Sequence, residues 1–349
     1  MISVLIPVYN IENKQRKLEM AIRSVLEQSY RNFELIMVND GSNDNSSIIL
    51  QKIQAQDNRI RIITKENGGV ESARREGLKN AKGDFILHMD QDDMYRYDAF
   101  EVFLHKMEET NADVVIANHT RFIFNRFFNF GKCNTPSMQD EKVVRHDEFM
   151  KHYYISFFGI NDLPVNIWNK MYRRHFLDNC PVPPLTGQII EDLSYNMHIL
   201  PYAEKIAIIP EVLYYYRWGG FSNRFDTTIL DTALIGYQYK NKLINQYGLN
   251  DFKLPTSIEL LNYMNGLFFQ SVEYNMLNKE EFIREVERIC AMPEVIESLK
   301  IVQFYDNYHR EYIDAMLAHD YESLYIYELN YKNKHRVRRL LKNTLLKVS

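Results

Sequence analysis

The stretch Phe85-Ile86-Leu87-His88-Met89-Asp90-Gln91-Asp92-Asp93 decides the fold class of this chain. Residues 85–89 are nearly continuously apolar and show no two-residue alternation, which is typical of a central strand covered on both faces. The acidic residues follow at the carboxyl end of that strand, where open α/β sheets bind ligands. These carboxylates repel one another and need a positively charged partner. This favours a Mg²⁺ or Mn²⁺ ion bound between the carboxylates and a phosphate. A solvated acidic turn is the alternative.

Strands and helices alternate through the first third of the chain. Apolar runs predict strands at 3–8, 33–38, 60–63 and 85–89. Apolar residues recur three and four positions apart within 18–26, 46–53 and 70–81, which is the period of one buried helical face. Strands joined by helical crossovers predict an α/β fold with a doubly wound, mostly parallel sheet and right-handed connections over residues 1–120.

Composition and charge narrow the class of protein. The 349 residues are 46% hydrophobic and 25% charged, which fits two globular domains or one large core with an appendage. A net charge of −4 provides no basic field, so we expect no nucleic acid partner. Three scattered cysteines predict neither a zinc site nor a disulfide framework and favour a reducing compartment. The sequence shows no basic leader and no run of about 18 apolar residues, so we expect no signal peptide and no membrane span.

Polar residues follow the other predicted strands and are expected at the same sheet edge. Asp40 can accept from a base edge or a ribose hydroxyl there, although Asp40-Gly41-Ser42 also suits a plain turn. Asn67-Gly68-Gly69 opens a helix, and helix N-termini bind anions. Arg74 on that helix either reaches a diphosphate or lies in solvent. The sequence contains neither a Gly-x-Gly-x-x-Gly fingerprint nor a P-loop, which disfavours nicotinamide dehydrogenases and P-loop nucleotidases.

Four motifs in this order resemble those of the family 2 glycosyltransferases of GT-A fold. They are Ile6-Pro7-Val8-Tyr9-Asn10, Val38-Asn39-Asp40-Gly41-Ser42, Asn67-Gly68-Gly69 with Ala73-Arg74, and Met89-Asp90-Gln91-Asp92-Asp93. The resemblance is strong over residues 1–120 and moderate over 160–220. It implies a Rossmann-like GT-A domain in which the nucleotide of a sugar donor, usually UDP, lies across the strand ends.

The resemblance also implies roles for individual residues. Those expected around the nucleoside, the phosphates and the donor sugar are Pro7, Tyr9, Glu12, Asp40, Asn67, Gly68, Arg74, Asp90 and Gln91. Asp40 would read the uracil edge, and Asp92 together with Asp90 would hold Mn²⁺ or Mg²⁺. The chain departs from the family pattern at two points: the segment after Asn10 is a few residues longer, and Glu76 stands where the family often has Asn.

The region after residue 120 is predicted to bind the acceptor. The aromatic residues Phe122, Phe124, Phe127, Phe128 and Phe130 predict a strand or hairpin beside the acceptor cleft, with core packing as the alternative. The segment from Trp168 to Arg173 resembles a strand that leads to the acceptor site in the family. Glu191 and Asp192 open a predicted helix, where acids ordinarily complement the helix dipole. The resemblance implies that this acidic pair provides the catalytic base, and we assign that role to Asp192.

The remaining chain is predicted to close the catalytic domain and then to become helical. Short strands are expected at 206–209 and 213–218, followed by Gly219-Gly220 as a lid hinge or a plain turn, and helices at 227–248, 257–277 and 279–289. We therefore divide the chain into a catalytic domain at 1–222, with a donor half at 1–120 and an acceptor half at 121–222, a helical region at 223–331 and a tail at 332–349. Three roles are open for the helical region: packing on the catalytic domain, binding of the acceptor, or formation of a homo-oligomer. The tail carries seven Lys or Arg and no acid, and either contacts anionic membrane or fluctuates in solvent.

These observations predict an inverting, metal-dependent glycosyltransferase. It would move a sugar from a UDP-sugar to a hydroxyl of a growing or lipid-linked glycan, with a bacterial cell-surface polymer favoured by family habit. We expect it in the cytoplasm, either free or associated with the inner face of the cell membrane. The alternatives are a nucleotide-sugar-binding protein without turnover, a sugar-phosphate nucleotidyltransferase, and a phosphate-receiving signalling domain. A nucleotidyltransferase would require a Gly-rich loop after the first strand, and a signalling domain would require acidic residues there. This chain has Pro7-Val8-Tyr9-Asn10 at that point.

Overall fold

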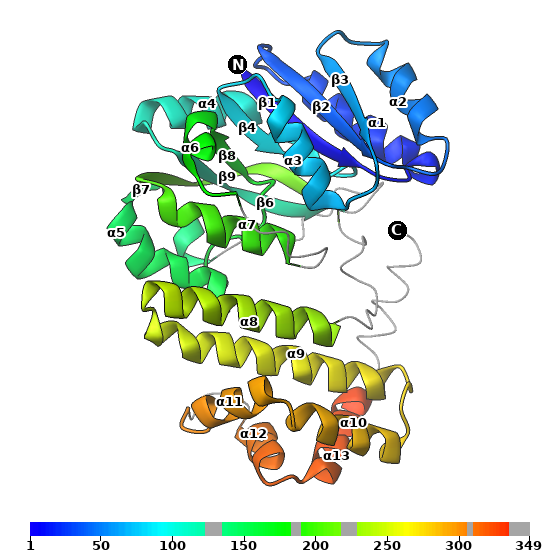
Figure 1. The fold of residues 1–349 in the computed structure, drawn as a ribbon, viewed down its shortest axis with the longest axis vertical. Coiled ribbons are helices and arrows are strands. Elements are labelled where there is room, and N and C mark those ends of the chain that lie inside the picture. The colour runs from blue at the N-terminus through cyan, green and yellow to red at the C-terminus, as the bar shows by residue number, and fades with distance from the viewer. Residues whose placement is uncertain (123–134, 183–189, 218–228, 306–309, 335–349) are drawn as a thin grey trace. The chain divides into compact units, whose positions relative to one another are not determined.

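The computed structural model describes residues 1–122, 135–182, 190–217, 229–305 and 310–334. The chain forms two compact units (Figure 1), the first made of Met1–Phe157 with Asn161–Trp218 and the second of Phe158–Ile160 with Gly219–Ser349. The predicted boundary at residue 222 lies outside the described residues. The predicted hinge at Gly219-Gly220 and most of the phenylalanine-rich segment after Phe122 lie outside them as well.

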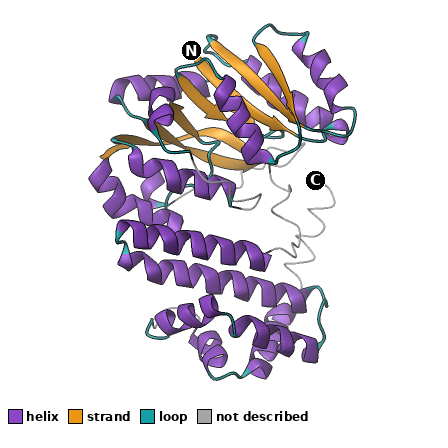
Figure 2. Ribbon diagram, viewed as in Figure 1, coloured by secondary structure: helices purple, strands orange, loops and turns teal. Residues whose placement is uncertain are grey.

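The first unit is built on a mixed sheet (Figure 2). The strands that the structure describes are β1 (Ile2–Val8), β2 (Phe33–Asp40), β3 (Ile60–Lys65), β4 (Phe85–His88), β5 (Met94–Tyr95), β6 (Val114–Phe122), β7 (Lys142–Arg145), β8 (Lys170–Arg173) and β9 (Lys205–Arg217). Their order is β3-β2-β1-β4-β8-β6-β9-β5, and β7 also pairs with β9. The pairs β1–β2, β1–β4 and β2–β3 are parallel. This confirms the predicted doubly wound sheet, in which the strand order reverses between β1 and β4.

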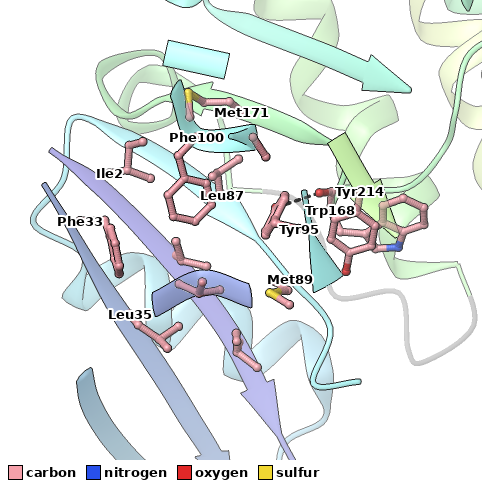
Figure 3. Packing of buried hydrophobic residues seen from close by; sticks show 14 of the residues in the cluster. Ile2, Phe33, Leu35, Leu87, Met89, Tyr95, Phe100, Trp168, Met171 and Tyr214 are labelled. Carbon is pink, nitrogen blue, oxygen red and sulfur yellow. Dashed lines mark hydrogen bonds between the residues drawn. The ribbon is translucent and has the colours of Figure 1, made fainter. Parts of the chain in front are cut away.

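The helices of the first unit connect these strands. They are α1 (Gln15–Leu26), α2 (Ser46–Gln54), α3 (Val70–Asn80), α4 (Ala99–Thr110), α5 (His146–Glu148), α6 (Arg174–Asn179) and α7 (Glu191–Ile199). Helix α1 buries Leu18, Ala21, Ile22 and Val25, which is the spacing of a single helical face. Every residue of β2 and β4 is buried, as expected of central strands. Figure 3 shows Leu87 of β4 among side chains from several strands and from α4.

Strand β9 differs from the prediction of two short strands at 206–209 and 213–218. It is a single strand that pairs with β6 along most of its length. Its register against β6 moves from Ile116 opposite Ile208 to Asn118 opposite Val212, so β9 accommodates extra residues around Pro210. Proline has no N–H to donate to a ladder and is tolerated at such a bulge. Because the pairing resumes beyond the bulge, the strand continues where the local sequence predicts a break.

The second unit is helical in its described part. Its helices are α8 (Ile229–Tyr247), α9 (Lys253–Glu273), α10 (Lys279–Cys290), α11 (Pro293–Val302), α12 (Arg310–Leu317) and α13 (Tyr321–Lys334). Helix α9 starts and ends four residues earlier than predicted. Asn275, just after its end, has a left-handed φ of 52°, and Asn278 forms a capping box that starts α10. Within the described residues, none of the helices has the length and apolar character needed to cross a bilayer.

Helix α13 includes the first three residues of the predicted basic tail, and 335–349 lie outside the described residues. Membrane contact through this tail, homo-oligomer formation through the helical region and the three-part division of the chain therefore stay proposals.

Replacing the buried Glu328 of α13 by Gln is expected to stabilise the protein at alkaline pH. Its side chain is 1% exposed, Oε1 has no hydrogen-bond partner among the described residues, and burial raises the pKa of the carboxyl to about 8. The carboxyl of Glu in an unfolded chain has a pKa of about 4.3. Between this pH and about pH 8, the folded state keeps a proton that the unfolded state has released, so the free energy of unfolding falls as the pH rises. Glu328→Gln should match the parent near about pH 4 and exceed its unfolding free energy by roughly 2–4 kcal/mol at about pH 9.

Urea denaturation at both pH values measures this difference. Glu322→Gln, on the same helix with a 67% exposed side chain, is the matched control and should be nearly neutral. A difference between Glu328→Gln and the parent that does not change with pH would show that the pKa of this carboxyl is the same in the folded and the unfolded state.

Candidate active site

The candidate site begins where the strand order reverses. The segments after β1 and β4 leave neighbouring parallel strands at their carboxyl ends, which is where α/β sheets bind ligands. The backbone N–H of Tyr9, after β1, donates to Oε1 of Gln91, after β4, at 3.2 Å. Tyr9 is 43% exposed, and Pro7 lies two residues earlier, in β1. The structure therefore brings two of the predicted donor-binding segments into direct contact.

The acidic residues after β4 have different environments. Asp93 is 1% exposed and accepts hydrogen bonds from the Tyr214 hydroxyl at 2.9 Å and the Arg217 backbone N–H at 2.7 Å. Burial and the neighbouring carboxylates raise the pKa of Asp93 well above its usual value. The side chains of Asp90 and Asp92 are 32% and 30% exposed. Asp93 thus anchors β9 to this loop, and only Asp90 and Asp92 remain open to a ligand.

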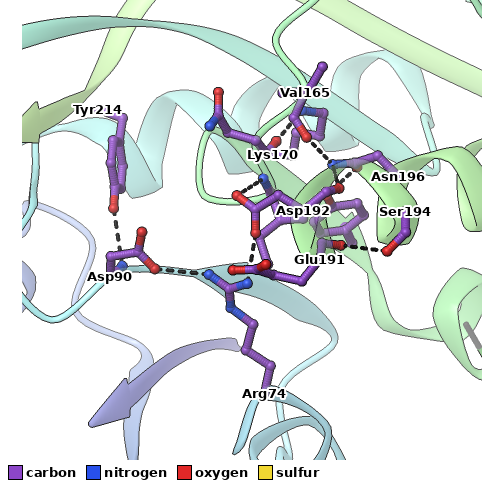
Figure 4. A network of polar contacts seen from close by, with 12 residues as sticks. Arg74, Asp90, Val165, Lys170, Glu191, Asp192, Ser194, Asn196 and Tyr214 are labelled. Atoms are coloured by element: carbon purple, nitrogen blue, oxygen red, sulfur yellow. Dashed lines mark hydrogen bonds and ion pairs between the residues drawn. The ribbon is translucent and has the colours of Figure 1, made fainter. Parts of the chain in front are cut away.

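Arg74 of α3 joins the acidic loop to α7 (Figure 4). Its Nη2 lies 2.9 Å from Oδ1 of Asp90, and its Nη1 lies 2.7 Å from Oδ1 of Asp192. Burial alone would lower the pKa of this guanidinium, but the charges of Asp192, Asp90 and Glu191 raise it above its ordinary value. The Arg74 side chain is only 10% exposed, so it is a fixed positive charge between two carboxylates. Arg74 therefore does not lie in solvent.

Glu191 and Asp192 occupy the first turn of α7, as predicted. The second oxygen of Asp192 accepts from the backbone N–H of Ile167 at 3.4 Å. Burial, followed by the charge of Asp192, raises the pKa of Glu191 to about 7. Burial likewise raises the pKa of Asp90 to about 6, against the opposing effect of Arg74. Carboxyl groups that titrate this close to neutrality are typical of sites that exchange protons or bind cations.

Asp40 holds the start of α3 in place. Its Oδ1 accepts from Lys65 Nζ at 2.7 Å and from the Gly68 N–H at 3.1 Å, and its Oδ2 accepts from the Gly69 N–H at 2.8 Å. The Asn67 side chain donates to the Asp40 carbonyl at 3.0 Å. The anion at this helix N-terminus is therefore the Asp40 carboxylate itself. Contact between Asp40 and a uracil edge stays a prediction.

The predicted site residues thus fall into separate sets. Ion pairs and mutual charge effects connect Arg74, Asp90, Glu191 and Asp192, whereas Asp40, Asn67 and Gly68 form a second set. Tyr9 with Gln91 forms a third, and Asp92 follows Gln91 in sequence. Glu12, in the turn before α1, accepts from the Asn45 side chain at 2.7 Å, and its role at the nucleoside stays a prediction.

Two supporting residues carry no predicted role. The Tyr214 hydroxyl accepts from the Asp90 backbone N–H at 3.2 Å, and its ring stacks on Trp168 at 4.3 Å between centroids. Lys170 of β8 is fully buried and lies in the same polar network as Asp192 (Figure 4). Lys170 lies in the segment 168–173 that resembles the family, and Tyr214 lies in a predicted strand, but only the three-dimensional contacts show what these side chains hold.

The order of the strands, with parallel strands on either side of the reversal between β1 and β4, is that of a GT-A fold. The sequence model described as Glycosyl transferase family 2 matches residues 3–180, and the chain belongs to this family. This confirms the family and the fold class predicted from the motifs.

Known proteins support the same assignment. The glycosyltransferase GlyA of Streptococcus pneumoniae is 30% identical over 216 residues, covering 62% of this chain and 30% of GlyA. The minor teichoic acid biosynthesis protein GgaB of Bacillus subtilis is 25% identical over 91% of this chain and 37% of its own length. The chain thus spans less than half of either relative. The crystal structure of S. aureus TarS 1–349 with UDP-GlcNAc superimposes with a TM-score of 0.62 at 17% identity, covering 97% of this chain and 91% of that one.

Proposed function

We propose that this protein transfers a sugar from a nucleoside-diphosphate sugar, with a UDP-sugar favoured, to a hydroxyl group of a glycan, with inversion at the anomeric carbon. The observation that carries the proposal is the Arg74 bridge, which brings the acidic loop and the Asp192 carboxylate to one site. The solved TarS structure contains UDP-GlcNAc, and GgaB is named for teichoic acid biosynthesis. A lipid-linked or growing cell-surface polymer is therefore the proposed acceptor.

Asp192 is the proposed general base. Its carboxylate takes the proton of the acceptor hydroxyl as that oxygen forms a bond to the anomeric carbon. The bond from that carbon to the donor phosphate breaks, and its electron pair leaves with the nucleoside diphosphate. Attack from the face opposite the leaving group gives inversion. Arg74, held beside Asp192, supplies a positive charge for the departing diphosphate.

Asp90 and Asp92 are the proposed ligands of a divalent cation. Carboxylate oxygens suit Mg²⁺ and Mn²⁺, which usually bind one or two carboxylates together with substrate phosphates. Both side chains are about one-third exposed, as such sharing requires. Within the described ranges, no group of three or more His, Cys, Asp or Glu is placed to hold a metal alone, so donor phosphates would complete the site. A bound cation would neutralise charge that develops on the leaving group.

A screen of sugar nucleotides for UDP release is expected to identify the donor. One UDP-sugar should be hydrolysed slowly by water in place of the acceptor, and a chelator should stop the release. Released UDP is measured by a coupled assay, with the Asp192→Asn variant as the control for contaminating hydrolases. Binding of UDP without release from any sugar nucleotide would favour the binding-protein alternative, and release of pyrophosphate in a parallel assay with UTP and a sugar 1-phosphate would favour a nucleotidyltransferase.

A further inference from the structure

Lys170 is a buried cation that the proposed chemistry does not use. It is 0% exposed, and its ammonium donates to the carbonyls of Pro164, at 2.8 Å, and Asn166, and to Oδ1 of Asn169 at 3.1 Å. All three acceptors belong to residues 164–169, the loop that enters β8. An ammonium has three N–H donors, so this loop satisfies Lys170 completely. Burying such a charge is costly without partners, so Lys170 and the loop hold each other in one arrangement.

The same loop is tied to the first turns of α7 (Figure 4). The Ile167 N–H donates to Oδ2 of Asp192 at 3.4 Å. The side-chain amide of Asn196 donates both to the Val165 carbonyl at 2.9 Å and to the Asp192 carbonyl at 3.0 Å. The loop thus contacts the Asp192 carboxylate directly through Ile167, and it is linked to the Asp192 backbone carbonyl through the side chain of Asn196.

The contact between Ile167 and Asp192 depends on where the loop lies. At 3.4 Å it is at the long end of the hydrogen-bond range, so a small displacement of the loop would break it. The other carboxylate oxygen is fixed by Arg74, a residue that is also expected to meet the donor phosphates. Because bound phosphates would share the Arg74 guanidinium with Asp192, the loop is the support for the orientation of Asp192 that does not depend on the donor.

We propose that Lys170 is a positioning residue for Asp192, acting through the loop 164–169 that it clamps. This inference rests on the proposed role of Asp192 as general base. Lys170 acts in its charged form, because only the ammonium can donate to all three acceptors. Burial lowers the pKa of Lys170 to about 7, against the attraction of Asp192. His119 is a second titratable group near Lys170, and burial together with the charge of Lys170 lowers its pKa to about 4, which leaves it neutral.

Replacing Lys170 by Met tests the proposal, because Met fills similar volume without donors. We expect kcat for transfer to fall by about 10–100-fold, the effect of slight misplacement of a catalytic group, with donor KM and UDP affinity unchanged within about twofold. Asn196→Ala, which cuts the link between the loop and α7, should also lower kcat. If Lys170→Met does not fold, Asn196→Ala carries the same comparison.

The decisive measurement combines Lys170→Met with Asp192→Asn. A residue that acts only by orienting the base has nothing left to orient once the base is gone, so the double variant should match Asp192→Asn alone. Lys240→Met is the control: this lysine is equally buried, in the second unit, where it pairs with Glu259, and its loss should lower stability without lowering kcat.

An equal loss of kcat from Lys170→Met in both backgrounds, or a loss confined to donor KM, would overturn the positioning role. Retention of transfer by Asp192→Asn would instead overturn the proposed function, so the two failures are distinguishable.

Discussion

Replacing Asp192 by Asn is expected to lower kcat for sugar transfer by about 10²–10⁴-fold, the usual contribution of a general base, while UDP affinity changes little. Asn has the same shape, and its one carbonyl oxygen can keep the hydrogen bond from Arg74 Nη1, whereas the NH2 group at the second position loses only the long 3.4 Å contact with the Ile167 N–H. Asn cannot take a proton from the acceptor hydroxyl. Initial rates with saturating donor and acceptor, together with calorimetry of UDP binding, separate these two effects.

Two further variants make the assignment specific. Asp178→Asn changes a 57% exposed acid on α6 and should leave the rate unchanged. Glu191→Gln tests the neighbouring acid, whose pKa of about 7 means that it is partly protonated at neutral pH. We expect Glu191→Gln to cost less than Asp192→Asn. If Glu191→Gln abolishes transfer and Asp192→Asn does not, the base is Glu191.

The parts of the fold that follow from local pattern were predictable from sequence. The apolar run at 85–89 and the alternation of strands and helices before it predict the parallel strands β1 to β4, and hence the strand-order reversal that places Gln91 beside Tyr9. The acidic pair at 191–192 is at the start of a helix, as its spacing predicts. These features depend on periodicity and on residues close in sequence.

Features that depend on distant partners were not predictable. The sequence assigns Asp90 and Asp92 to the metal and gives Asp93 no role, and only the contacts of Asp93 with Tyr214 and Arg217 show that it supports the loop. Lys170 lies in a strand-like segment, and its role emerges only from the carbonyls folded around it. The open helix N-terminus predicted at Gly68 is filled by Asp40, which is 28 residues away in sequence.

Replacing Asp92 by Asn is expected to remove the metal dependence of UDP binding. Of the three acids after β4, Asp90 is engaged by Arg74 at 2.9 Å and Asp93 by Tyr214 and Arg217, whereas the Asp92 carboxylate lies 4.0 Å from Arg217 Nε. Asp92 therefore has the carboxylate most available to a cation shared with phosphates. Loss of its charge should weaken UDP binding in the presence of Mn²⁺ by at least about 10-fold, or about 1.4 kcal/mol.

Calorimetry with Mn²⁺ and with a chelator, for the parent and for Asp92→Asn, tests this expectation. The parent should lose affinity on chelation, and the variant should bind equally weakly in both buffers, because the cation acts through the side chain that it lacks. Asp98→Asn, which changes a 44% exposed acid paired with Arg96, should behave like the parent. Equal UDP affinity in all four combinations of parent, Asp92→Asn and buffer would mean that the phosphates are held by Arg74 and other protein groups without a cation. Asp90 and Asp92 would then act on the sugar or ribose, and the diphosphate would leave with protein cations alone to balance its charge.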